Sequence, residues 1–246
     1  MISIIIPALN EEKLIAEVLR QFTSEMVCRF DLEIILSDGG STDATRQIAE
    51  AAGGENQLRI MILEHTGNCR QTIAGGRNAG AMHAQGETLL FLNADTRFRN
   101  TEQFFAELIR TMRDASVLAA TCPVQIFPEE EKGIDRLFHY CHNGYCRLLN
   151  FIGEGMGRGE CHIIRRGIFQ STGGYNEAMA AGEDYDLFRR IRKMGKIAFL
   201  KNTILYESPR RFRKYGYAHI VWGWTKNAHG VVFRKKSSSE VWEAVR

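Results

Sequence analysis

Four acidic side chains stand where chemistry is most readily placed, at the ends of buried strands or at the start of a helix. Asp38 and Asp95 each follow a short apolar run, and the adjacent pair Glu183 and Asp184 opens a strongly amphipathic segment. Carboxylates in such positions can hold a hard divalent cation, accept hydrogen bonds from a nucleotide, or accept a proton. Because they are far apart in the sequence, this chemistry needs a fold that brings them to one crevice.

Asp95 is the candidate metal ligand. It closely follows the apolar run Leu89–Leu92, which is typical of a strand buried on both faces of a parallel sheet. Ligands of open α/β sheets bind outside the carboxyl ends of such strands, where a magnesium-type ion can bridge one carboxylate and a diphosphate. The alternative is that Asp95 and Thr96 only cap the following helix.

The other candidates also have structural alternatives. Asp38 either accepts hydrogen bonds from a base or ribose, or only forms a turn. Glu183 and Asp184 lie in a predicted first helical turn, where the helix dipole keeps carboxylates ionised and able to accept a proton, but the same dipole favours acids there without any catalytic role. Arg77 either clamps a phosphate or is a surface arginine.

The elements that must position these residues alternate along the first half of the chain. The pattern predicts that Pro7 ends the first strand, that Asn10 caps the first helix, and that Gly75-Gly76 forms a turn before the helix that carries Arg77. Strands are predicted at 2–6, 32–36, 58–63, 88–92 and 117–126 and later at 162–165, and helices at 11–22, 44–52, 77–85, 101–112 and 134–151 and from 183 onward. Strands alternating with helices indicate an α/β fold with a doubly wound, mostly parallel sheet flanked by helices.

Composition is that of an ordinary globular protein. The 246 residues are 44% hydrophobic and 25% charged, and the net charge of +3 excludes a strongly basic nucleic-acid-binding surface over the whole chain. The six cysteines show no disulfide rhythm, which fits a reducing compartment. With no leader segment and no apolar window of about 18 residues, we expect a cytoplasmic protein whose membrane contact, if any, is peripheral at the inner face.

The segment 210–236 is basic and aromatic, with eight Lys or Arg and no acid. One interpretation is a helix that packs on the sheet while Arg210, Arg211 and Arg213 close over a diphosphate as a lid. A second is a helix lying on an anionic membrane surface. Binding of single-stranded nucleic acid is the least favoured of the three.

Five motifs, taken in order and spacing, resemble those of the inverting glycosyltransferases of family 2. They are Ser3–Glu11, Ser37–Asp43, Gly76–Gly80, Asn93–Asp95 and Gly182–Asp184, and the resemblance covers about residues 1–206. It implies the GT-A fold, a nucleotide-diphospho-sugar donor, and a divalent metal, Mn²⁺ or Mg²⁺.

The resemblance also implies roles for individual residues. Pro7, Leu9 and Glu11 would border the nucleoside, Asp38 would contact the base, and Arg77 would lie near the nucleotide. Asp95 matches the last acid of the family's Asp-x-Asp motif and would hold the metal, with Asn93 in place of the first acid. Asp184, beside Glu183, matches the catalytic base. Gly39 stands where many members have a second aspartate, and the Gln-x-x-Arg-Trp signature of processive members is missing, which favours transfer of single sugars.

These observations predict a catalytic domain at 1–206, with a nucleotide-binding half at 1–126 and an acceptor half at 127–206, followed by a C-terminal helical, basic extension at 207–246. The expected activity is metal-dependent, inverting transfer of one sugar to an acceptor hydroxyl in glycan or glycolipid synthesis, with a lipid-linked acceptor among the candidates. A sugar-nucleotide nucleotidyltransferase is an alternative, although the chain lacks a glycine-rich basic loop after the first strand. A non-catalytic lipid- or nucleic-acid-binding module is the other alternative.

Overall fold

A seven-stranded sheet forms the centre of the computed structural model, which describes residues 1–67, 71–234 and 237. The strand order is β3-β2-β1-β4-β8-β6-β9, and β8 alone runs antiparallel to its neighbours. The bounds are β1 (Ile2–Ala8), β2 (Leu32–Asp38), β3 (Ile60–Glu64), β4 (Thr88–Leu92), β6 (Val117–Thr121), β8 (Cys161–Arg165) and β9 (Lys196–Phe199). This arrangement confirms the predicted α/β fold with a mostly parallel sheet.

A second, three-stranded sheet has the order β5-β10-β7. Its strands are β5 (Thr96–Phe98), β7 (Val124–Ile126) and β10 (Leu205–Glu207). β5 begins directly after Asp95, and β10 is followed within three residues by Arg210. This small sheet therefore ties the start of the C-terminal extension to the end of β4.

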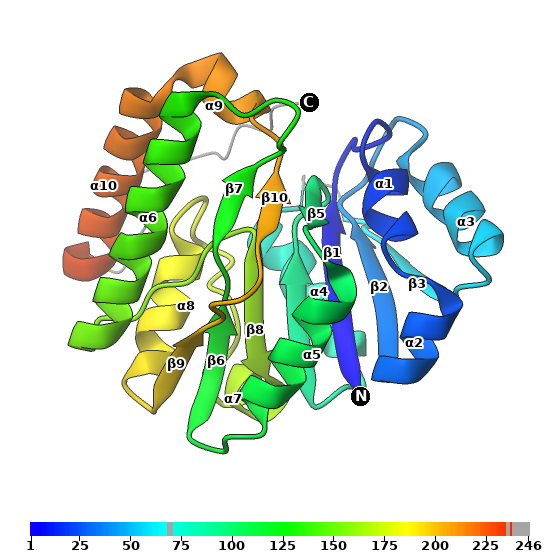
Figure 1. Cartoon of the computed structure of the whole chain (residues 1–246), viewed down its shortest axis with the longest axis horizontal. Coiled ribbons are helices and arrows are strands. Elements are labelled where there is room, and N and C mark those ends of the chain that lie inside the picture. The colour runs from blue at the N-terminus through cyan, green and yellow to red at the C-terminus, as the bar shows by residue number, and fades with distance from the viewer. Residues whose placement is uncertain (68–70, 235–236, 238–246) are drawn as a thin grey trace.

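Helices cover both faces of the main sheet, and no helix among the described residues is long and apolar enough to cross a bilayer. They are α1 (Ile15–Arg20), α2 (Ser24–Phe30), α3 (Thr45–Glu55), α4 (Ile73–His83), α5 (Thr101–Met112), α6 (Gly133–Ile152), α7 (Arg166–Ser171), α8 (Glu183–Arg192), α9 (Arg210–Tyr215) and α10 (Tyr217–Arg234). Helices α1 and α3 lie beside β1 to β3, whereas α6, α9 and α10 gather at the other end of the molecule (Figure 1).

The core has one layer on each face of the sheet because successive strand side chains point to opposite faces. Ile4 and Ile6 of β1 belong to the layer under α1 and α5, and Ile5 belongs to the layer under α4 and α8. All three side chains are fully buried. The apolar runs of the sequence are therefore strands with helices on both sides, as predicted.

Two predictions at the end of β1 were wrong. The strand does not stop at Pro7, because it pairs with β2 through Ala8 and Asp38. Its pairing with β4 ends at Ile5, so the edge of β1 that faces β4 is unpaired at Pro7. Proline has no backbone N–H, and on this edge no ladder hydrogen bond is lost. Asn10 is not a helix cap: its φ is 55°, and its Oδ1 accepts a hydrogen bond from the backbone N–H of Thr42 at 2.8 Å.

Gly75-Gly76 does not form a turn but lies inside α4, whose N-cap is Thr72. These glycines allow close approach instead. A Cβ on Gly76 would lie 3.3 Å from that of Pro7, and a Cβ on Gly80 would lie 2.4 Å from Cγ2 of Ile5. Glycine at these positions lets α4 lie against β1.

The predicted strand 117–126 is two strands, β6 and β7, which belong to different sheets. Helix α2 and strands β9 and β10 were not predicted from the sequence. The C-terminal helices α9 and α10 confirm a helical extension as far as residue 234, while residues 235, 236 and 238–246 lie outside the described part of the chain.

Candidate active site

Asp95 and Glu11 both pair with the guanidinium group of Arg210. The guanidinium Nη2 of Arg210 lies 2.9 and 2.8 Å from the two carboxylate oxygens of Glu11 and 3.1 Å from Oδ2 of Asp95. The backbone N–H of Ser208 also donates to the carbonyl oxygen of Asp95 at 3.3 Å. The beginning of the C-terminal extension therefore lies over the end of β4, and the interpretation of Arg210 as part of a lid over a diphosphate stays a prediction.

Glu11 is placed by the turn after β2. Its backbone N–H donates to Oγ1 of Thr45 at 2.7 Å, and the N–H of the preceding Asn10 donates to Oγ of Ser41 at 2.9 Å. The Glu11 side chain is only 7% exposed. A buried carboxylate needs a compensating charge, and Arg210 supplies it here.

Arg77 joins the end of β4 to the start of α8. Its Nη1 donates to Oε1 of Glu183 at 3.0 Å, and its Nη2 donates to Oδ1 of Asn93 at 3.1 Å and to the carbonyl oxygen of Gly159 at 2.6 Å. The guanidinium also lies over the ring of Tyr175, 5.2 Å from its centroid. The side chain is 2% exposed, so Arg77 is neither a surface arginine nor open to a phosphate in this structure. Its predicted contact with a nucleotide stays a prediction.

The adjacent acids Glu183 and Asp184 differ in their partners. Glu183 is held by Arg77, whereas Asp184 accepts a hydrogen bond from the backbone N–H of Tyr185 at 2.7 Å. A Cβ on Gly159 would lie 3.2 Å from Oδ2 of Asp184, so this oxygen faces the loop before β8. Asp184 is the less restrained of the two carboxylates.

Burial raises the pKa of both acids, and for Glu183 the neighbouring charge of Asp184 adds to the effect, while Arg77 opposes it. The pKa of Glu183 rises to about 7. For Asp184 the increase comes from burial first and is opposed by Arg77 and by the Tyr185 N–H. Carboxylates with raised pKa values are better proton acceptors than ordinary surface acids.

Asp38 is engaged by its own turn. Its Oδ2 accepts hydrogen bonds from the backbone N–H groups of Gly40 at 3.2 Å and Ser41 at 3.0 Å, and its Oδ1 accepts from the hydroxyl of Ser41. The residue is 1% exposed. The turn interpretation therefore describes this carboxylate as it stands, and its contact with a base remains a prediction.

The predicted residues nevertheless meet at one edge of the sheet. Pro7 and Leu9 are partly buried at the carboxyl end of β1, next to Asp38 at the end of β2. Arg210 links Glu11 to Asp95, and Arg77 links Asn93 to Glu183. Two arginines thus connect acids and an amide that come from three separate segments.

Three positioning features were not predicted. The side-chain amide of Asn78 pins the loop after α7, donating to the carbonyl oxygen of Tyr175 and accepting from its N–H. The carbonyl oxygen of Gly159 bonds to Arg77. The buried Arg158 pairs with Glu160 and Glu207, both at 3.2 Å. Of these, only Asn78 had a signal in the sequence, as a member of the motif Gly76–Gly80.

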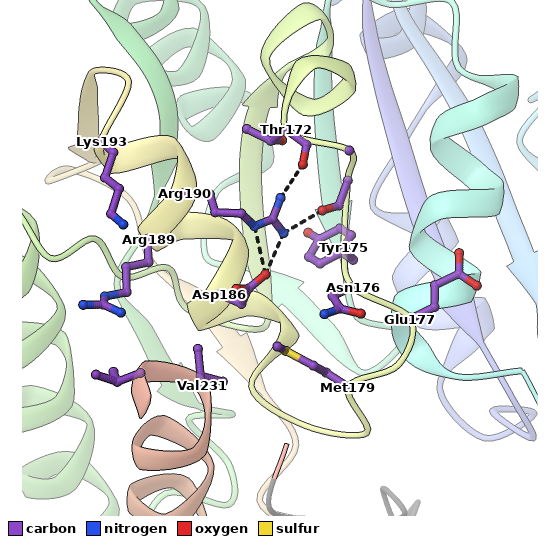
Figure 2. Close-up of a pocket in the computed structure, with 13 residues that line it drawn as sticks. Thr172, Tyr175, Asn176, Glu177, Met179, Asp186, Arg189, Arg190, Lys193 and Val231 are labelled. Carbon is purple, nitrogen blue, oxygen red and sulfur yellow. Dashed lines mark hydrogen bonds and ion pairs between the residues drawn. The ribbon is translucent and has the colours of Figure 1, made fainter. Parts of the chain in front are cut away.

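A separate cavity of about 610 Å³ lies beside α8 (Figure 2). It is lined by the loop after α7, by Asp186 and Arg190 of α8, by Lys193 directly after α8, and by Val231 of α10. Arg190 already donates to Asp186 and to the carbonyl oxygens of Thr172 and Gly174. None of the predicted site residues lines the cavity, so we keep the two features apart.

The residues at the end of β4 fit a divalent cation. Within residues 1–67, 71–234 and 237, no group of three or more His, Cys, Asp or Glu side chains is arranged to hold a metal by itself. Magnesium-type sites, however, use one or two carboxylates together with substrate phosphates. Asp95 and Glu11 face the same point, which already attracts the positive charge of Arg210.

Comparisons with known proteins assign the chain to a family. Residues 3–173 match Glycosyl transferase family 2, and the chain belongs to this family. It is 25% identical over 211 residues, 84% of the chain, to the succinoglycan biosynthesis protein ExoA of Rhizobium meliloti (strain 1021). It is 30% identical over 76% of the chain to a PGL/p-HBAD biosynthesis glycosyltransferase of Mycobacterium bovis (strain BCG / Pasteur 1173P2), 67% of which it covers.

Solved structures show the same fold. A mannosyltransferase of Pyrobaculum calidifontis in complex with GDP-Man and Mn²⁺ aligns over 94% of this chain with a TM-score of 0.71 and 21% identity. TarS residues 1–349 of S. aureus in complex with UDP-GlcNAc aligns over 84% of this chain and 58% of that one, with a TM-score of 0.62 and 18% identity. This likeness confirms the GT-A fold expected from the motifs. The chain spans 63% of the ExoA relative and 61% of the mannosyltransferase chain.

Proposed function

We propose that the protein is a metal-dependent inverting glycosyltransferase that moves a single sugar from a nucleotide-diphosphate donor to an acceptor hydroxyl. The observation that carries this proposal is the bridge made by Arg77 between Asn93 and Glu183. It holds the Asn-Ala-Asp segment, which ends in Asp95, against the segment that contains Asp184. A one-step displacement at an anomeric carbon requires a group that binds the leaving diphosphate and a group that accepts the proton of the acceptor hydroxyl.

Asp184 has the role of the general base. An acceptor hydroxyl is a poor nucleophile, so its proton is taken by Asp184 as the oxygen attacks the anomeric carbon. The bond to the acceptor oxygen forms while the bond to the diphosphate oxygen breaks, and the electron pair leaves on the diphosphate. Attack from the opposite face inverts the anomeric centre in one step. Glu183, tied to Arg77, positions Asp184 and contributes to the charge of the site.

Asp95, with Glu11 near it, would hold the divalent cation. When bound, such an ion neutralises charge on a departing diphosphate, an effect of about several kcal/mol in related chemistry. Arg210 supplies positive charge at the same place in this structure. Its release from the two carboxylates would leave its guanidinium beside the diphosphate-binding region.

The neighbours' ligands support a nucleotide-sugar donor. GDP-Man with Mn²⁺ is named for the mannosyltransferase, and Mn²⁺ with UDP is named for the glucosyl-3-phosphoglycerate synthase of Mycobacterium tuberculosis. The relatives' names, succinoglycan biosynthesis and PGL/p-HBAD biosynthesis, support an acceptor in glycan or glycolipid synthesis, which includes a lipid-linked one. The described cysteines are all free, and this supports a cytoplasmic location.

A donor panel tests the proposal. Purified protein is incubated with UDP- and GDP-sugars in the presence of Mn²⁺, Mg²⁺ or a chelator, and release of the nucleoside diphosphate is measured together with the anomeric configuration of the product by NMR. We expect turnover of at least one donor, loss of turnover with the chelator, and an inverted product. No turnover with any donor, or a product of retained configuration, would contradict the proposal.

A further inference from the structure

Helix α6 carries its apolar side chains on the outside. Most of its large apolar and aromatic residues are exposed, and they are Ile134, Leu137, Tyr140, Tyr145, Leu148, Phe151 and Ile152. Tyr140 is 78% exposed and Phe151 86%. The buried side of the same helix includes Asp135, His139, Asn143 and Asn150. This is the reverse of an ordinary amphipathic helix on a globular protein, whose apolar stripe faces the core.

The polar inner side of α6 is fitted to the protein. The side-chain amide of Asn143 donates to the carbonyl oxygen of Val124 at 3.0 Å and accepts from its N–H at 3.1 Å. Asn150 makes the same pair of bonds with the backbone of Met156, each at 2.8 Å. Asp135 is paired with Arg213. Turning the apolar side inward would break these contacts, so the outward orientation is fixed by the fold.

The exposed residues form one continuous stripe. They fall into two runs with a spacing of three residues, 134–137–140 and 145–148–151, with Ile152 next to the second run. Both runs lie along one side of a helix of 20 residues, which is about 30 Å long. Isolated exposed apolar residues are ordinary, but a contiguous stripe of this length marks a surface that contacts something else. The stripe lies on the side of α6 that faces away from the sheet.

The neighbouring helix also exposes large aromatic side chains. α10 packs alongside α6, with the rings of Trp224 and His142 4.9 Å apart (Figure 1). It exposes Trp222 and Phe233, which are 62% and 73% accessible. Tryptophan and tyrosine, with a polar atom on an apolar ring, are the side chains that gather at the boundary between lipid and water.

The charges on α6, α9 and α10 are mostly positive. Acidic side chains flank α6 at both ends, and of these Glu131 is paired with Arg136 and Glu154 with Arg189. α6 contains one carboxylate, the buried Asp135, and neither α9 nor α10 contains any. The exposed charged residues of these helices include Arg147, Lys214, Lys226 and Arg234. A two-fold dimer through this surface would place like charges against each other, because both copies present the same patch. An anionic surface is complementary to it.

We propose that the outer side of α6, together with the exposed aromatic residues of α10, docks on an anionic lipid membrane. The apolar stripe would enter the boundary between headgroups and acyl chains while the cations meet the phosphate groups. The sequence placed a membrane contact on residues 210–236 alone, and the structure puts most of the apolar contact on α6 instead. The surface lies outside the proposed transfer site and goes beyond the transfer reaction.

Vesicle flotation tests the docking. The protein is mixed with vesicles of phosphatidylcholine alone or of phosphatidylcholine with phosphatidylglycerol, without donor or acceptor, so the result is independent of sugar transfer. We expect flotation with the anionic vesicles, weakened by high salt because salt screens the cations. The double variant Leu148→Gln, Phe151→Ser should bind about tenfold less tightly. Met82→Gln, which changes an 84% exposed apolar side chain on α4, is the matched control and should bind as the unmodified protein does.

Two further measurements use the unmodified chain. Hydrogen exchange should slow over 133–152 when anionic vesicles are added, and light scattering should show no dimer that depends on the stripe. Absence of flotation with both kinds of vesicle would overturn the proposal. A dimer that Leu148→Gln, Phe151→Ser turns into a monomer would also overturn it, since a second copy would then cover the stripe.

Discussion

Arg77 and Glu183 form a buried ion pair, with Nη1 3.0 Å from Oε1, although 106 residues separate them in the sequence. The same guanidinium bonds to Asn93 at the end of β4. The pair therefore connects the two segments that the proposed reaction needs together, and its energetics can be measured.

Replacing Arg77 by methionine should destabilise the protein and abolish turnover. Glu183 would lose the opposite charge that Arg77 supplies at a buried position, and breaking a buried pair from one side costs about 3–5 kcal/mol. Urea denaturation measures the free energy of unfolding. Arg20→Met, which removes an exposed ion pair with Glu55, is the matched control and should change it by about 1 kcal/mol or less. A stable, active Arg77→Met variant would show that the pair does not organise the site.

The pH dependence should report the raised pKa of Asp184. Below that pKa the carboxyl group carries a proton and cannot accept another, so turnover falls as the pH is lowered through it and reaches a plateau above it. Because burial raises the pKa of Asp184, this fall in turnover should occur above the ordinary pKa of aspartate, which is about 4. A profile of kcat against pH measures the limb. A rate that is constant down to the ordinary value would exclude a buried aspartate as the base.

Removing Arg210 should separate metal binding from donor binding. In Arg210→Ala the carboxylates of Glu11 and Asp95 lose the cation that they share, so Mn²⁺ alone should bind more tightly, by about tenfold. Electron paramagnetic resonance of free Mn²⁺ measures this directly, without turnover. The Michaelis constant for the donor should rise if the guanidinium also contacts the diphosphate. Arg213→Ala, which removes a pair with Asp135, serves as the control for Mn²⁺ binding. Weaker Mn²⁺ binding in Arg210→Ala would contradict competition for the same carboxylates.

Asp135 should stabilise the docking of α9 and α10 on α6. Its Oδ1 accepts from Nη1 of Arg213 at 2.8 Å, and it also accepts from the hydroxyl of Tyr217. Asp135→Asn should lower the free energy of unfolding by about 1.5–3 kcal/mol, the usual contribution of hydrogen bonds to a charged group. The exposed Glu130→Gln on the preceding loop is the control.

The same residue predicts a pH effect on stability. Arg213, more than any other group, lowers the pKa of Asp135 below its unfolded value. Its contribution is therefore complete above about pH 4 and is lost as the pH falls through the lowered pKa. Denaturation of the unmodified protein should depend more steeply on pH in the acid range than that of Asp135→Asn. Equal slopes would show that the pair contributes little.

The local sequence pattern was sufficient to predict the bounds of some elements. The bounds predicted for β4 and α5 are those of the structure, because a buried apolar run ends abruptly in the first case and the side chain of Asn100 caps the helix in the second. The order of strands and helices was also sufficient to predict a mostly parallel sheet. Glycines misled the prediction near Arg77, since Gly76 and Gly80 serve close packing on β1 and not a turn.

Contacts between residues far apart in the sequence could not be predicted from it. Nothing local shows that Arg77 is buried, because its burial depends on Asn93, Gly159 and Glu183. The link from Arg210 to Glu11 joins residues that are 199 positions apart in the sequence. For α6 the pattern predicted a helix but not its orientation, since the rule that apolar residues face the core gives the wrong side. The backbone partners of Asn143 and Asn150, and the pairing of Asp135 with Arg213, show that its polar side faces inward.

The base assignment is tested most directly by comparing Asp184→Asn with Asp186→Asn. The two aspartates lie two residues apart on α8, and Asp186 pairs with Arg190 beside the separate cavity. Calorimetry measures nucleotide binding in both variants. Asp184→Asn should bind the donor nucleotide normally but turn over about 10²–10⁴-fold more slowly. Asp186→Asn should keep both normal binding and normal turnover. Equal turnover in Asp184→Asn and the unmodified protein would contradict the account.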